Sequence, residues 1–372
     1  MRTFEHPAGV HNATPPRIVF GPGTAARLGD EIDRLGARRA LIVTTPGRAG
    51  MGDGFASTIG DRCAGLLPEA VSQVPVEVVQ RGVQKAAGRG ADCLIAIGGG
   101  AATGLCKGIA LETGMPIIAV PTTYSGSEMT GYCGMTADGV KRMRESRRML
   151  ASTVIYDAEL SISLPPATSA SSAMNALAHS VDAVYLPSLS PLLVPAAVEG
   201  ARVVTEALPI LLANPGDLAA RNEMLYGAYL CGAALTGGFA IQHAIAHMLG
   251  GSYGVEHGTA HAVVLPYVTE HLLRHAAGPL GRIARAVGTD DLAGHIWDLV
   301  HDAGLPTRLA DVGFGPQDED RAVVIATTAD GPAAGPDVHD ASRAGNPAPV
   351  TEDAVRAILS AAAAGERPGG TP

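Results

Sequence analysis

The stretch DCLIAIGGGAATGLCKGIALETG, residues 92–114, constrains the fold more than any other part of the chain. Its apolar run at 93–97 has the length of a buried strand, three glycines follow, and the residues after them suit a helix. A strand that leads through a turn into a helix is the repeating unit of a parallel sheet, because the helix returns the chain to the start of the next strand. The stretch therefore predicts an α/β domain with a parallel sheet.

The same alternation of strands and helices extends over the first half of the chain. RIVFG at 17–21, the run at 40–44 and STVIYD at 152–157 are apolar and β-branched, as expected of strands. The other elements that we expect there are strands at 76–79 and within MPIIAVP, and helices within PGTAARLGDEIDRLG, around 51–66 and over 82–91. Helices then cover both faces of one parallel sheet, as in Rossmann-like dinucleotide-binding domains.

The second half of the chain has the composition of helices. After about residue 160 the β-branched runs give way to Ala- and Leu-rich segments, which favour helix. We therefore expect an α/β domain at 1–160 and an all-helical domain at 161–372. Its helices are expected at roughly 167–186, 191–213, 217–238, 239–250, 260–275, 279–287, 291–303 and 351–363. Residues 328–349 are rich in Gly, Pro and Asp and predict a surface loop.

Composition excludes several classes of function. The formal charge of −9 argues against a nucleic-acid partner, since no broad basic face is present to replace phosphate counterions. The five cysteines show no CxxC spacing, which fits a reducing, cytoplasmic location and argues against a zinc ribbon or a disulfide framework. No apolar run reaches about 18 residues and the N-terminus lacks the layout of a signal peptide, so we expect no membrane partner. A small-molecule substrate fits these limits.

Two loops at the carboxyl ends of expected strands suit a dinucleotide cofactor. Ligands of parallel sheets bind at this edge, where glycine N–H groups can approach a pyrophosphate at the positive end of the next helix and hydroxyl groups can bind ribose or amide. The residues are Gly98, Gly99 and Gly100 in the first loop and Thr122, Thr123 and Ser127 in the second. The alternative is a tight turn without a ligand, since the glycines do not form a GxGxxG motif.

The end of the strand at 40–44 bears on the choice between NADH and NADPH. An NAD-selective site usually places Asp or Glu at this point, where it binds the ribose 2′-hydroxyl. Thr45 stands there instead, with Arg48 three residues on, so no carboxylate repels a 2′-phosphate. We therefore expect a site that accepts NADPH as well as NADH. The alternative for Arg48 is a solvated surface residue.

Five of the twelve histidines lie in three short, mostly apolar segments, MNALAHSV, IQHAIAHMLGG and VEHGTAHAVVLP. Buried imidazoles that lack a metal, a substrate or mutual hydrogen bonds leave polar groups unsatisfied. We expect the segments to converge on one pocket, as a metal site or a site of proton transfer. The alternative is a set of core histidines. The pairs spaced i, i+4, which helices project from one face, are Asn175/His179, His243/His247 and His257/His261.

The order of these motifs resembles one known family. The matching segments are GGGAATGLCKGIALETGMPIIAVPTTYSGSEMT, VIYDAELSISLP, MNALAHSVDAVY, HAIAHMLGG and HGTAHAVVLP. Nearly end to end, the chain resembles the group III iron-containing alcohol dehydrogenase superfamily, and within it the maleylacetate reductases. The reductase branch is supported by PTTYSGSEMT, by GDRCAGLLPEAVSQVPVEV at 60–78 and by Asn175.

The resemblance implies roles for the histidine segments. In metal-dependent members, histidines at the places of His179, His243 and His257 hold Fe²⁺ or Zn²⁺ together with an Asp at the place of Asn175. The histidine at the place of His247 lies beside the nicotinamide. Because Asn175 removes the one anionic ligand, we favour a metal-independent enzyme, with a bound Fe²⁺ or Zn²⁺ as the alternative. The segments HAIAH and HGTAH are closer to the pattern of metal-dependent members than the corresponding segments of typical maleylacetate reductases are.

The resemblance also implies a cofactor site and an assembly. The three glycines match a pyrophosphate loop, the hydroxyl-bearing loop after the next strand matches a second cofactor loop, and Lys141 matches a lysine that reaches the cofactor. Here AAT replaces STT after the glycines, which removes a serine hydroxyl from the first loop. A homodimer is implied as well.

These features predict an NADH- or NADPH-dependent reductase that transfers a hydride to an unsaturated keto acid, as in the reduction of maleylacetate to 3-oxoadipate. His243 and His247 are expected to transfer the proton and orient the substrate, while Asn175 and His179 hold its carboxylate or carbonyl. Three alternatives stay open. They are a metal-dependent alcohol dehydrogenase, a biosynthetic tailoring oxidoreductase of the same fold with another substrate, and a cofactor-binding protein without catalysis.

Overall fold

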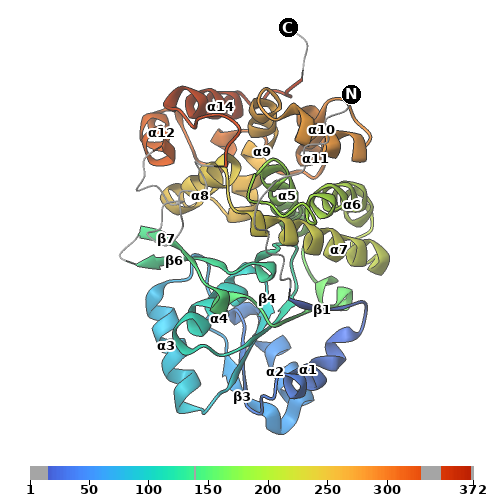
Figure 1. Cartoon of the computed structure of the whole chain (residues 1–372), viewed down its shortest axis with the longest axis vertical. Coiled ribbons are helices and arrows are strands. Elements are labelled where there is room, and N and C mark those ends of the chain that lie inside the picture. The colour runs from blue at the N-terminus through green and yellow to red at the C-terminus, as the bar shows by residue number, and fades with distance from the viewer. Residues whose placement is uncertain (1–15, 138–139, 328–344, 370–372) are drawn as a thin grey trace.

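The computed structural model describes residues 16–137, 140–327 and 345–369. Figure 1 shows two parts stacked along the long axis, with the sheet and its helices below and a helical part above. The expected fold class, a parallel α/β part followed by an all-helical part, is confirmed. The division at residue 160 stays a prediction.

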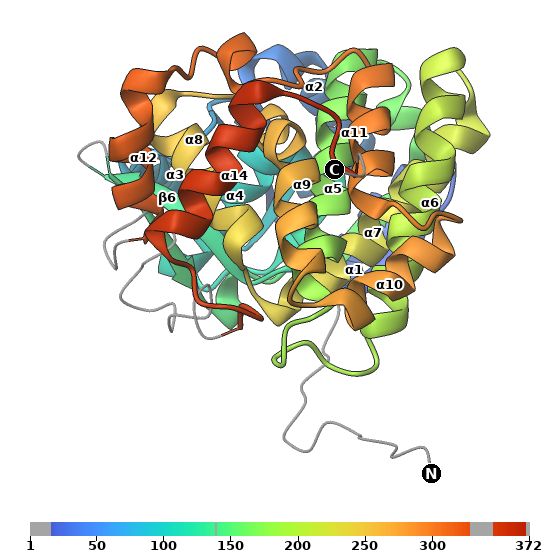
Figure 2. The ribbon, with the colours of Figure 1, turned by 90° about the horizontal axis from the view of Figure 1, so that it is seen from above.

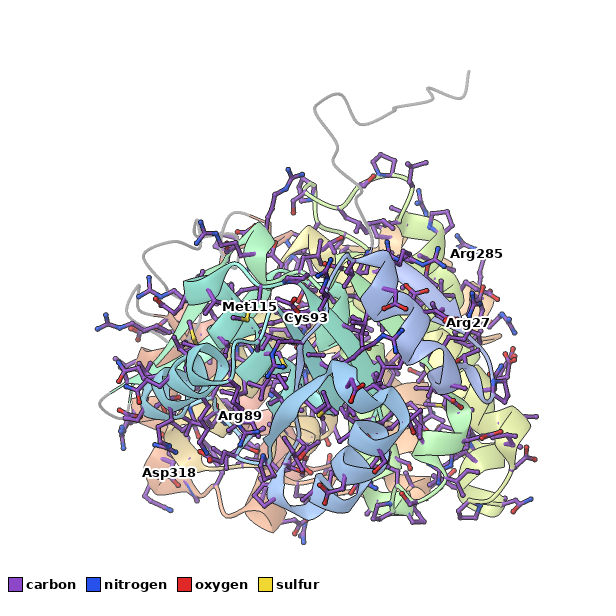
Figure 3. The ribbon with its side chains drawn as sticks, turned by 90° about the horizontal axis from the view of Figure 1, so that it is seen from below. Arg27, Arg89, Cys93, Met115, Arg285 and Asp318 are labelled. Carbon is purple, nitrogen blue, oxygen red and sulfur yellow. The ribbon has the colours of Figure 1, made fainter. Side chains whose placement is uncertain are left out.

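The sheet of the lower part has six parallel strands in the order β1-β8-β5-β4-β2-β3. They are β1 (Arg17–Phe20), β2 (Ala40–Val43), β3 (Cys63–Leu67), β4 (Cys93–Gly98), β5 (Ile117–Pro121) and β8 (Thr153–Tyr156). In the view from below, the labelled Cys93 begins β4 at the outer end of the sheet (Figure 3). The carboxyl ends of the strands therefore point toward the helical part.

The helices of the lower part cover both faces of the sheet because successive strand residues point to opposite sides. Leu94 and Ala96 of β4 belong to the hydrophobic core that contains α3 and α4. Ile95 and Ile97 belong to a second core formed with α1 and α2. The helices are α1 (Leu28–Arg34), α2 (Ala49–Ile59), α3 (Val76–Gly88) and α4 (Gly100–Thr113).

Two expected elements between β2 and β4 are wrong. The helix predicted around 51–66 ends at Ile59, and residues 63–67 form the edge strand β3. The strand predicted at 76–79 is the first turn of α3. Its β-branched residues favour a strand locally, but Val79 and Ala86 lie seven residues apart on one buried helical face. Tertiary burial of that face outweighs the local preference.

A β-hairpin that was not predicted follows β5. Strands β6 (Tyr132–Ala137) and β7 (Val140–Glu145) pair antiparallel, with Tyr132 opposite Glu145. Thr136 of β6 holds the loop before α3, because its N–H donates to Val74 O (3.1 Å) and its Oγ1 donates to Gln73 O (2.9 Å). Gln73 and Val74 have φ values of 65° and 46°, which are unfavourable for residues with side chains, above all for β-branched Val74.

The upper part consists of helices around α9, which packs against α5, α8, α11 and α14 (Figure 2). The helix α12 was not predicted, and residues 328–344 of the expected loop at 328–349 lie outside the described residues. The helices are α5 (Pro166–Ala183), α6 (Val194–Ala213), α7 (Leu218–Ala234), α8 (Ile241–Tyr253), α9 (His257–Leu273), α10 (Ala277–Ala286), α11 (Leu292–Asp302), α12 (Glu319–Thr327) and α14 (Glu352–Ala364). Among the described helices none is by itself long and apolar enough to cross a membrane, whereas Leu218–Gly237 and Ile241–Tyr253 together, bent by 102°, meet that requirement.

Two contacts fix the helical part on the carboxyl edge of the sheet. Arg221 of α7 is fully buried, and its guanidinium donates to Tyr124 Oη and Ser169 Oγ, both at 3.1 Å, and to Leu164 O at 3.0 Å. At the second contact, Gly126 of the loop after β5 touches Gly232 of α7 backbone to backbone. A Cβ on Gly232 would lie 2.8 Å from Gly126 O.

Candidate functional site

A cavity of about 600 Å³ lies between the carboxyl edge of the sheet and the helices α5, α8 and α9. It is the place where ligands of parallel sheets bind. The predicted site residues that line it are Gly100, Thr123, Ser127, Asn175, His179, His243, His247 and His257. The structure thus brings the expected cofactor loops and the histidine segments to one cavity.

The first glycines support this edge through the backbone rather than by lining the cavity. Gly98 ends β4 with φ 144°, a conformation that L side chains rarely adopt, and its carbonyl accepts from Thr122 N at 3.0 Å. A Cβ on Gly99 would lie 2.7 Å from Thr123 Oγ1. Gly100 begins α4 and lines the cavity. The two loops therefore pack so closely that a side chain on Gly99 would require Thr123 to move.

The loop after β5 presents hydroxyl groups that have no hydrogen-bond partner in the protein. Thr123 Oγ1 and Ser125 Oγ are both buried and unpartnered, and both residues line the cavity. Buried hydroxyls without a partner are rare, and they indicate a place where a ligand or water binds. The N-terminus of α4 carries positive partial charge beside them. These groups together suit the phosphates and the ribose of a dinucleotide.

Of the remaining cofactor candidates, Thr45 and Thr122 do not line the cavity. Thr45 stands at the end of β2, the neighbour of β4, and Thr122 is buried beside Gly98. Arg48, expected either at a 2′-phosphate or in solvent, donates to Ser163 Oγ at 2.8 Å. Lys141 lies opposite Thr136 in the hairpin, but its side chain is outside the described residues.

Helix α5 turns a polar face toward the cavity. Thr168, Ser171, Ser172, Asn175 and His179 follow each other at helical spacing and all line it. The amide nitrogen of Asn175 donates to Ser125 O at 3.4 Å, while its Oδ1 is buried without a partner. His179 packs its unpartnered Nδ1 against Gly126. Burial, followed by the nearby His243 and His257, holds the pKa of His179 well below its usual value, so this imidazole is neutral.

A buried carboxylate sets the orientation of His243. Asp182, three residues after His179 on α5, accepts from His243 Nδ1 at 2.7 Å and from Tyr185 Oη at 2.7 Å. It also accepts from the backbone N–H groups of Ala240 (2.9 Å) and His243 (3.2 Å), and so caps α8 from a different helix. Since Nδ1 donates to Asp182, His243 Nε2 carries the lone pair of the neutral ring. That atom is buried and unpartnered, and His243 lines the cavity.

His261 lies against His243, and its ring carries the hydrogen on Nε2, whereas the neutral ring of His243 carries it on Nδ1. Gln242 Nε2 donates to His261 O (3.3 Å), so it is the amide NH₂ group, and it also contacts His261 Nδ1 at 3.2 Å. His261 Nδ1 is therefore an acceptor and its Nε2 carries the hydrogen. Burial, and after it four neighbouring histidines, hold the pKa of His261 well below its usual value. The rings of His243 and His261 meet edge to face, with centroids 4.7 Å apart.

His247 and His257 complete the histidine group on the cavity wall. Their rings stack with centroids 5.5 Å apart, and His257 also meets His261 at 4.7 Å. Phe239 packs against His243 at 5.1 Å and against His247 at 5.7 Å, and it contacts Tyr132 of the hairpin at 5.1 Å. An aromatic wall thus closes this end of the cavity.

Known proteins resemble the chain over its whole length. The model of the C-terminal part of the Fe-containing alcohol dehydrogenase family matches residues 169–363, and the model of iron-containing alcohol dehydrogenase matches residues 15–158. A maleylacetate reductase of Burkholderia cepacia is 40% identical over 362 residues, 97% of this chain and 99% of that protein. The chain belongs to the iron-containing alcohol dehydrogenase family.

Solved structures of the family have the same fold. The crystal structure of maleylacetate reductase from Rhizobium sp. strain MTP-10005 gives a TM-score of 0.87 at 39% identity, covering 96% of this chain and 99% of that one. The crystal structure of maleylacetate reductase from Agrobacterium tumefaciens gives 0.88 at 39% identity, covering 99% and 100%. As a member of this family the chain is an oxidoreductase.

The family name raises the question of a metal, and the described side chains do not fit one. Of the predicted set, Asn175 supplies a neutral amide where a carboxylate would offset the charge of a divalent cation. Within the described part of the chain, no three His, Cys, Asp or Glu side chains are grouped so that they could hold a metal ion. We therefore derive no step of the chemistry through a metal.

Several residues at the cavity or beside it were not among the predicted site residues. Asp182 had a usable signal, because it follows His179 by three residues and so lies on a neighbouring face of the same helix. Ser125 lies in the loop that predicted Thr123 and Ser127, but it was not singled out. The segment 72–74 lines the cavity only because Gln73 and Val74 adopt positive φ, which no local pattern reveals.

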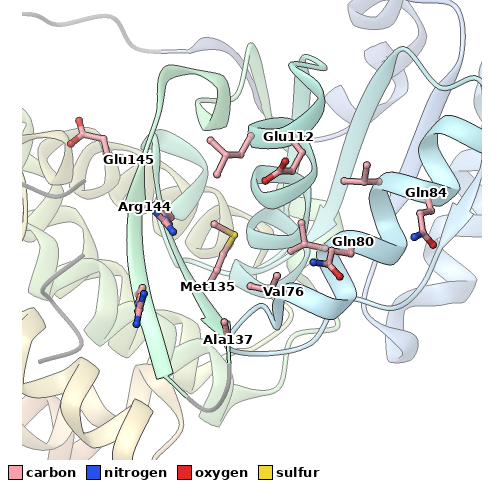
Figure 4. Close-up of a pocket in the computed structure, with 12 residues that line it drawn as sticks. Val76, Gln80, Gln84, Glu112, Met135, Ala137, Arg144 and Glu145 are labelled. Carbon is pink, nitrogen blue, oxygen red and sulfur yellow. The ribbon is translucent and has the colours of Figure 1, made fainter. Parts of the chain in front are cut away.

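A second, larger cavity of about 730 Å³ lies between α3, α4 and the hairpin. Figure 4 shows Val76 and Met135 among its apolar walls, with Gln80, Glu112 and Arg144 around them. None of the predicted site residues with described side chains lines it. The smaller cavity, where unpartnered polar atoms and imidazoles meet, is therefore the candidate site.

Proposed function

We propose that this protein is an NAD(P)H-dependent reductase of the maleylacetate reductase type, which transfers a hydride to an unsaturated keto acid. One observation carries the proposal: unpartnered hydroxyls beside a helix N-terminus share a cavity with His243, whose Nε2 is open to a ligand and whose Nδ1 is held by Asp182. The near-full-length relatives of the same kind support the choice of reaction.

The groups at the sheet side of the cavity support this choice of cofactor. The N-terminus of α4 at Gly100 and the hydroxyls of Thr123 and Ser125 suit the phosphates and ribose of NADH or NADPH. The nicotinamide end then extends along α5 toward the histidines. When bound, the reduced nicotinamide supplies the hydride.

The substrate end of the cavity favours delocalised negative charge over a point charge. Among the lining side chains that the structure describes, Glu256 is the only Asp, Glu, Lys or Arg, and its carboxylate is bonded to Gly258 N (3.0 Å) and Thr259 N (2.8 Å) of α9. Carboxylates of the substrate are therefore bound by amide and imidazole groups such as those of Asn175 and His179. This mode of binding suits an enolate formed during the reaction.

His243 is the proton donor in this proposal. The hydride adds to the alkene carbon that is β to the ketone, and the alkene electrons move to the carbonyl to form an enolate. His243, protonated at both nitrogens, keeps its Nδ1 proton on Asp182 and delivers the Nε2 proton to the α carbon. One hydride and one proton are consumed for each alkene that is reduced. The aromatic wall of Phe239 and Tyr132 limits water at this end.

The test is the oxidation of NADH and NADPH with maleylacetate, compared with simple aldehydes and ketones. Each reaction is run on protein treated with chelator and on protein supplied with Fe²⁺ or Zn²⁺, and bound metal is measured directly. We expect turnover of maleylacetate that chelator does not change. Turnover of aldehydes alone, dependent on stoichiometric metal, would refute the proposal in favour of a metal-dependent alcohol dehydrogenase.

A further inference from the structure

Helix α4 contains a buried lysine that the reaction described above does not use. Lys107 is 1% exposed and lies two turns after Gly100. Its ammonium donates to Ser127 O at 2.6 Å, to Tyr132 O at 2.7 Å and to Thr130 Oγ1 at 3.2 Å, and Ser127 Oγ lies 3.4 Å away. All these oxygens belong to residues that line the smaller cavity. The Lys107 side chain thus connects α4 to the loop after β5 and to the first residue of β6.

The chemistry of this contact requires a cation. An ammonium group has three hydrogens to donate, one for each of the three nearest oxygens, and charge-assisted hydrogen bonds are about twice as strong as neutral ones. Burial of a lysine is unfavourable, and none of the oxygens that Lys107 contacts belongs to a carboxylate. A shorter or apolar side chain would leave the Ser127 and Tyr132 carbonyls without their bonds to this group. The loop would then be free to shift relative to α4.

We infer that Lys107 is a positioning residue: it fixes the segment 125–132 against α4, so that the two halves of the dinucleotide site keep their spacing before the cofactor arrives. This inference rests on the proposed use of NAD(P)H. It assigns to Lys107 no contact with cofactor or substrate. Its effect is on the affinity for the dinucleotide, through the order of the loop that carries Ser125 and Ser127.

The ammonium group of Lys107 loses its proton at a pH at which binding can be measured. Burial lowers its pKa to about 8, against the opposing effects of Cys133 on β6 and of Glu128 in the loop. The Glu128 carboxyl is bonded to Tyr156 Oη at 2.8 Å, and burial raises its pKa. On the far side, Arg148 contacts α4 through Leu111 O at 3.3 Å. As pH rises through about 8 the ammonium loses a proton and one donor, so the loop loosens and dinucleotide affinity falls.

The experiment measures NADH binding by fluorescence on the whole protein, for wild type, Lys107→Met and the control Lys85→Met. Lys85 lies on α3 and pairs with Glu69 at the surface. We expect the Kd of Lys107→Met to rise about tenfold, the scale of one lost ~1.4 kcal/mol contact, and that of Lys85→Met to stay unchanged. Amide hydrogen exchange should quicken in segment 125–132 of Lys107→Met and stay unchanged in α9.

The pH dependence separates a positioning role from a general loss of stability. Between about pH 7 and pH 9 the wild-type Kd should rise toward that of Lys107→Met, whose own Kd should stay flat; a flat wild-type curve overturns the inference. Should Lys107→Met fail to fold, the wild-type pH curve and loop exchange at the two pH values still decide. Wild-type protein that binds neither NADH nor NADPH refutes the proposed function itself. Wild-type protein that binds NADH no better than Lys107→Met refutes the inference alone.

Discussion

Replacing Asp182 with Asn tests the link between the helix cap and the chemistry. Oδ2 of Asp182 accepts from His243 Nδ1, His243 N and Ala240 N, and Oδ1 accepts from Tyr185 Oη and Gln242 N. The Asn side chain has only one oxygen, whereas both oxygens of Asp182 accept hydrogen bonds. In either orientation of the amide, its NH₂ group therefore faces N–H or O–H groups that have no acceptor. With the NH₂ group toward His243, the ring must move its proton to Nε2 to accept at Nδ1. It then presents the wrong tautomer of the neutral ring to the cavity, and its charged form loses the counter-charge.

Two magnitudes decide what the variant should show. Breaking a buried charged hydrogen-bond network destabilises a protein by about 3–5 kcal/mol, whereas folded proteins are stable by about 5–15 kcal/mol. Asp182→Asn should therefore remain largely folded at moderate temperature. General acid catalysis contributes about 10²–10⁴-fold, and the same substitution in a Ser-His-Asp triad lowers kcat by about 10⁴-fold. We expect kcat to fall by about 10²–10⁴-fold, with NADH affinity nearly unchanged.

The assay is steady-state turnover at saturating NADH and maleylacetate, with the folded fraction measured by circular dichroism at the same temperature. The surface pair His301 Nδ1 and Asp302 Oδ1, 3.2 Å apart, offers a matched control, and Asp302→Asn should leave kcat unchanged. A double variant with His243→Ala should lose little more than His243→Ala alone, because both residues act through one ring. A folded Asp182→Asn protein with kcat within threefold of wild type would refute the reasoning.

Three further substitutions have definite expected outcomes. His243→Ala should abolish turnover while the Kd for NADH stays nearly constant; loss of both, measured side by side, would indicate a structural role instead. Gly99→Ala places a Cβ 2.7 Å from Thr123 Oγ1 and should raise the Kd for NADH about tenfold, whereas Gly50→Ala, which meets nothing within 4 Å, should not. Arg221→Met removes a buried cation from five neutral acceptors and should lower the free energy of unfolding by about 3–5 kcal/mol; urea denaturation with an unchanged midpoint would contradict this.

Local sequence patterns predicted the elements that are buried on both sides or along one stripe. The strand at Cys93–Gly98 was expected because a short, uninterrupted apolar run followed by glycines is typical of a buried strand. The strand predicted at 76–79 was wrong because four residues are too few to distinguish a strand from a helix. The buried apolar face that identifies the helix also includes Ala86, seven residues after Val79. The hairpin β6–β7 was missed because partly exposed strands with polar side chains lack a strong pattern.

The candidate site was predictable where residues share one helix and unpredictable where helices meet. Asn175 and His179 follow from spacing on α5, and their convergence with His243 was expected from the number of imidazoles. The bond from His243 to Asp182 links residues 61 apart in the chain, and its geometry depends on how the first turn of α8 packs against α5. Likewise the unpartnered state of Ser125 Oγ becomes visible only when every neighbouring donor and acceptor is placed.

The backbone contact between Gly126 and Gly232 has a consequence for how new substrate specificities arise on this scaffold. Glycine is the smallest residue, so no substitution at Gly126 or Gly232 can bring the sheet and the helices closer together. Any larger residue would clash with the facing backbone, so single substitutions here cannot adjust this distance. If the proposed function holds, adaptation to larger or smaller keto acids would instead proceed by changing the size of the side chains along α5, of which Ser171 and Ser172 line the cavity. A library confined to those two positions should therefore shift substrate size while keeping the Kd for NADH constant.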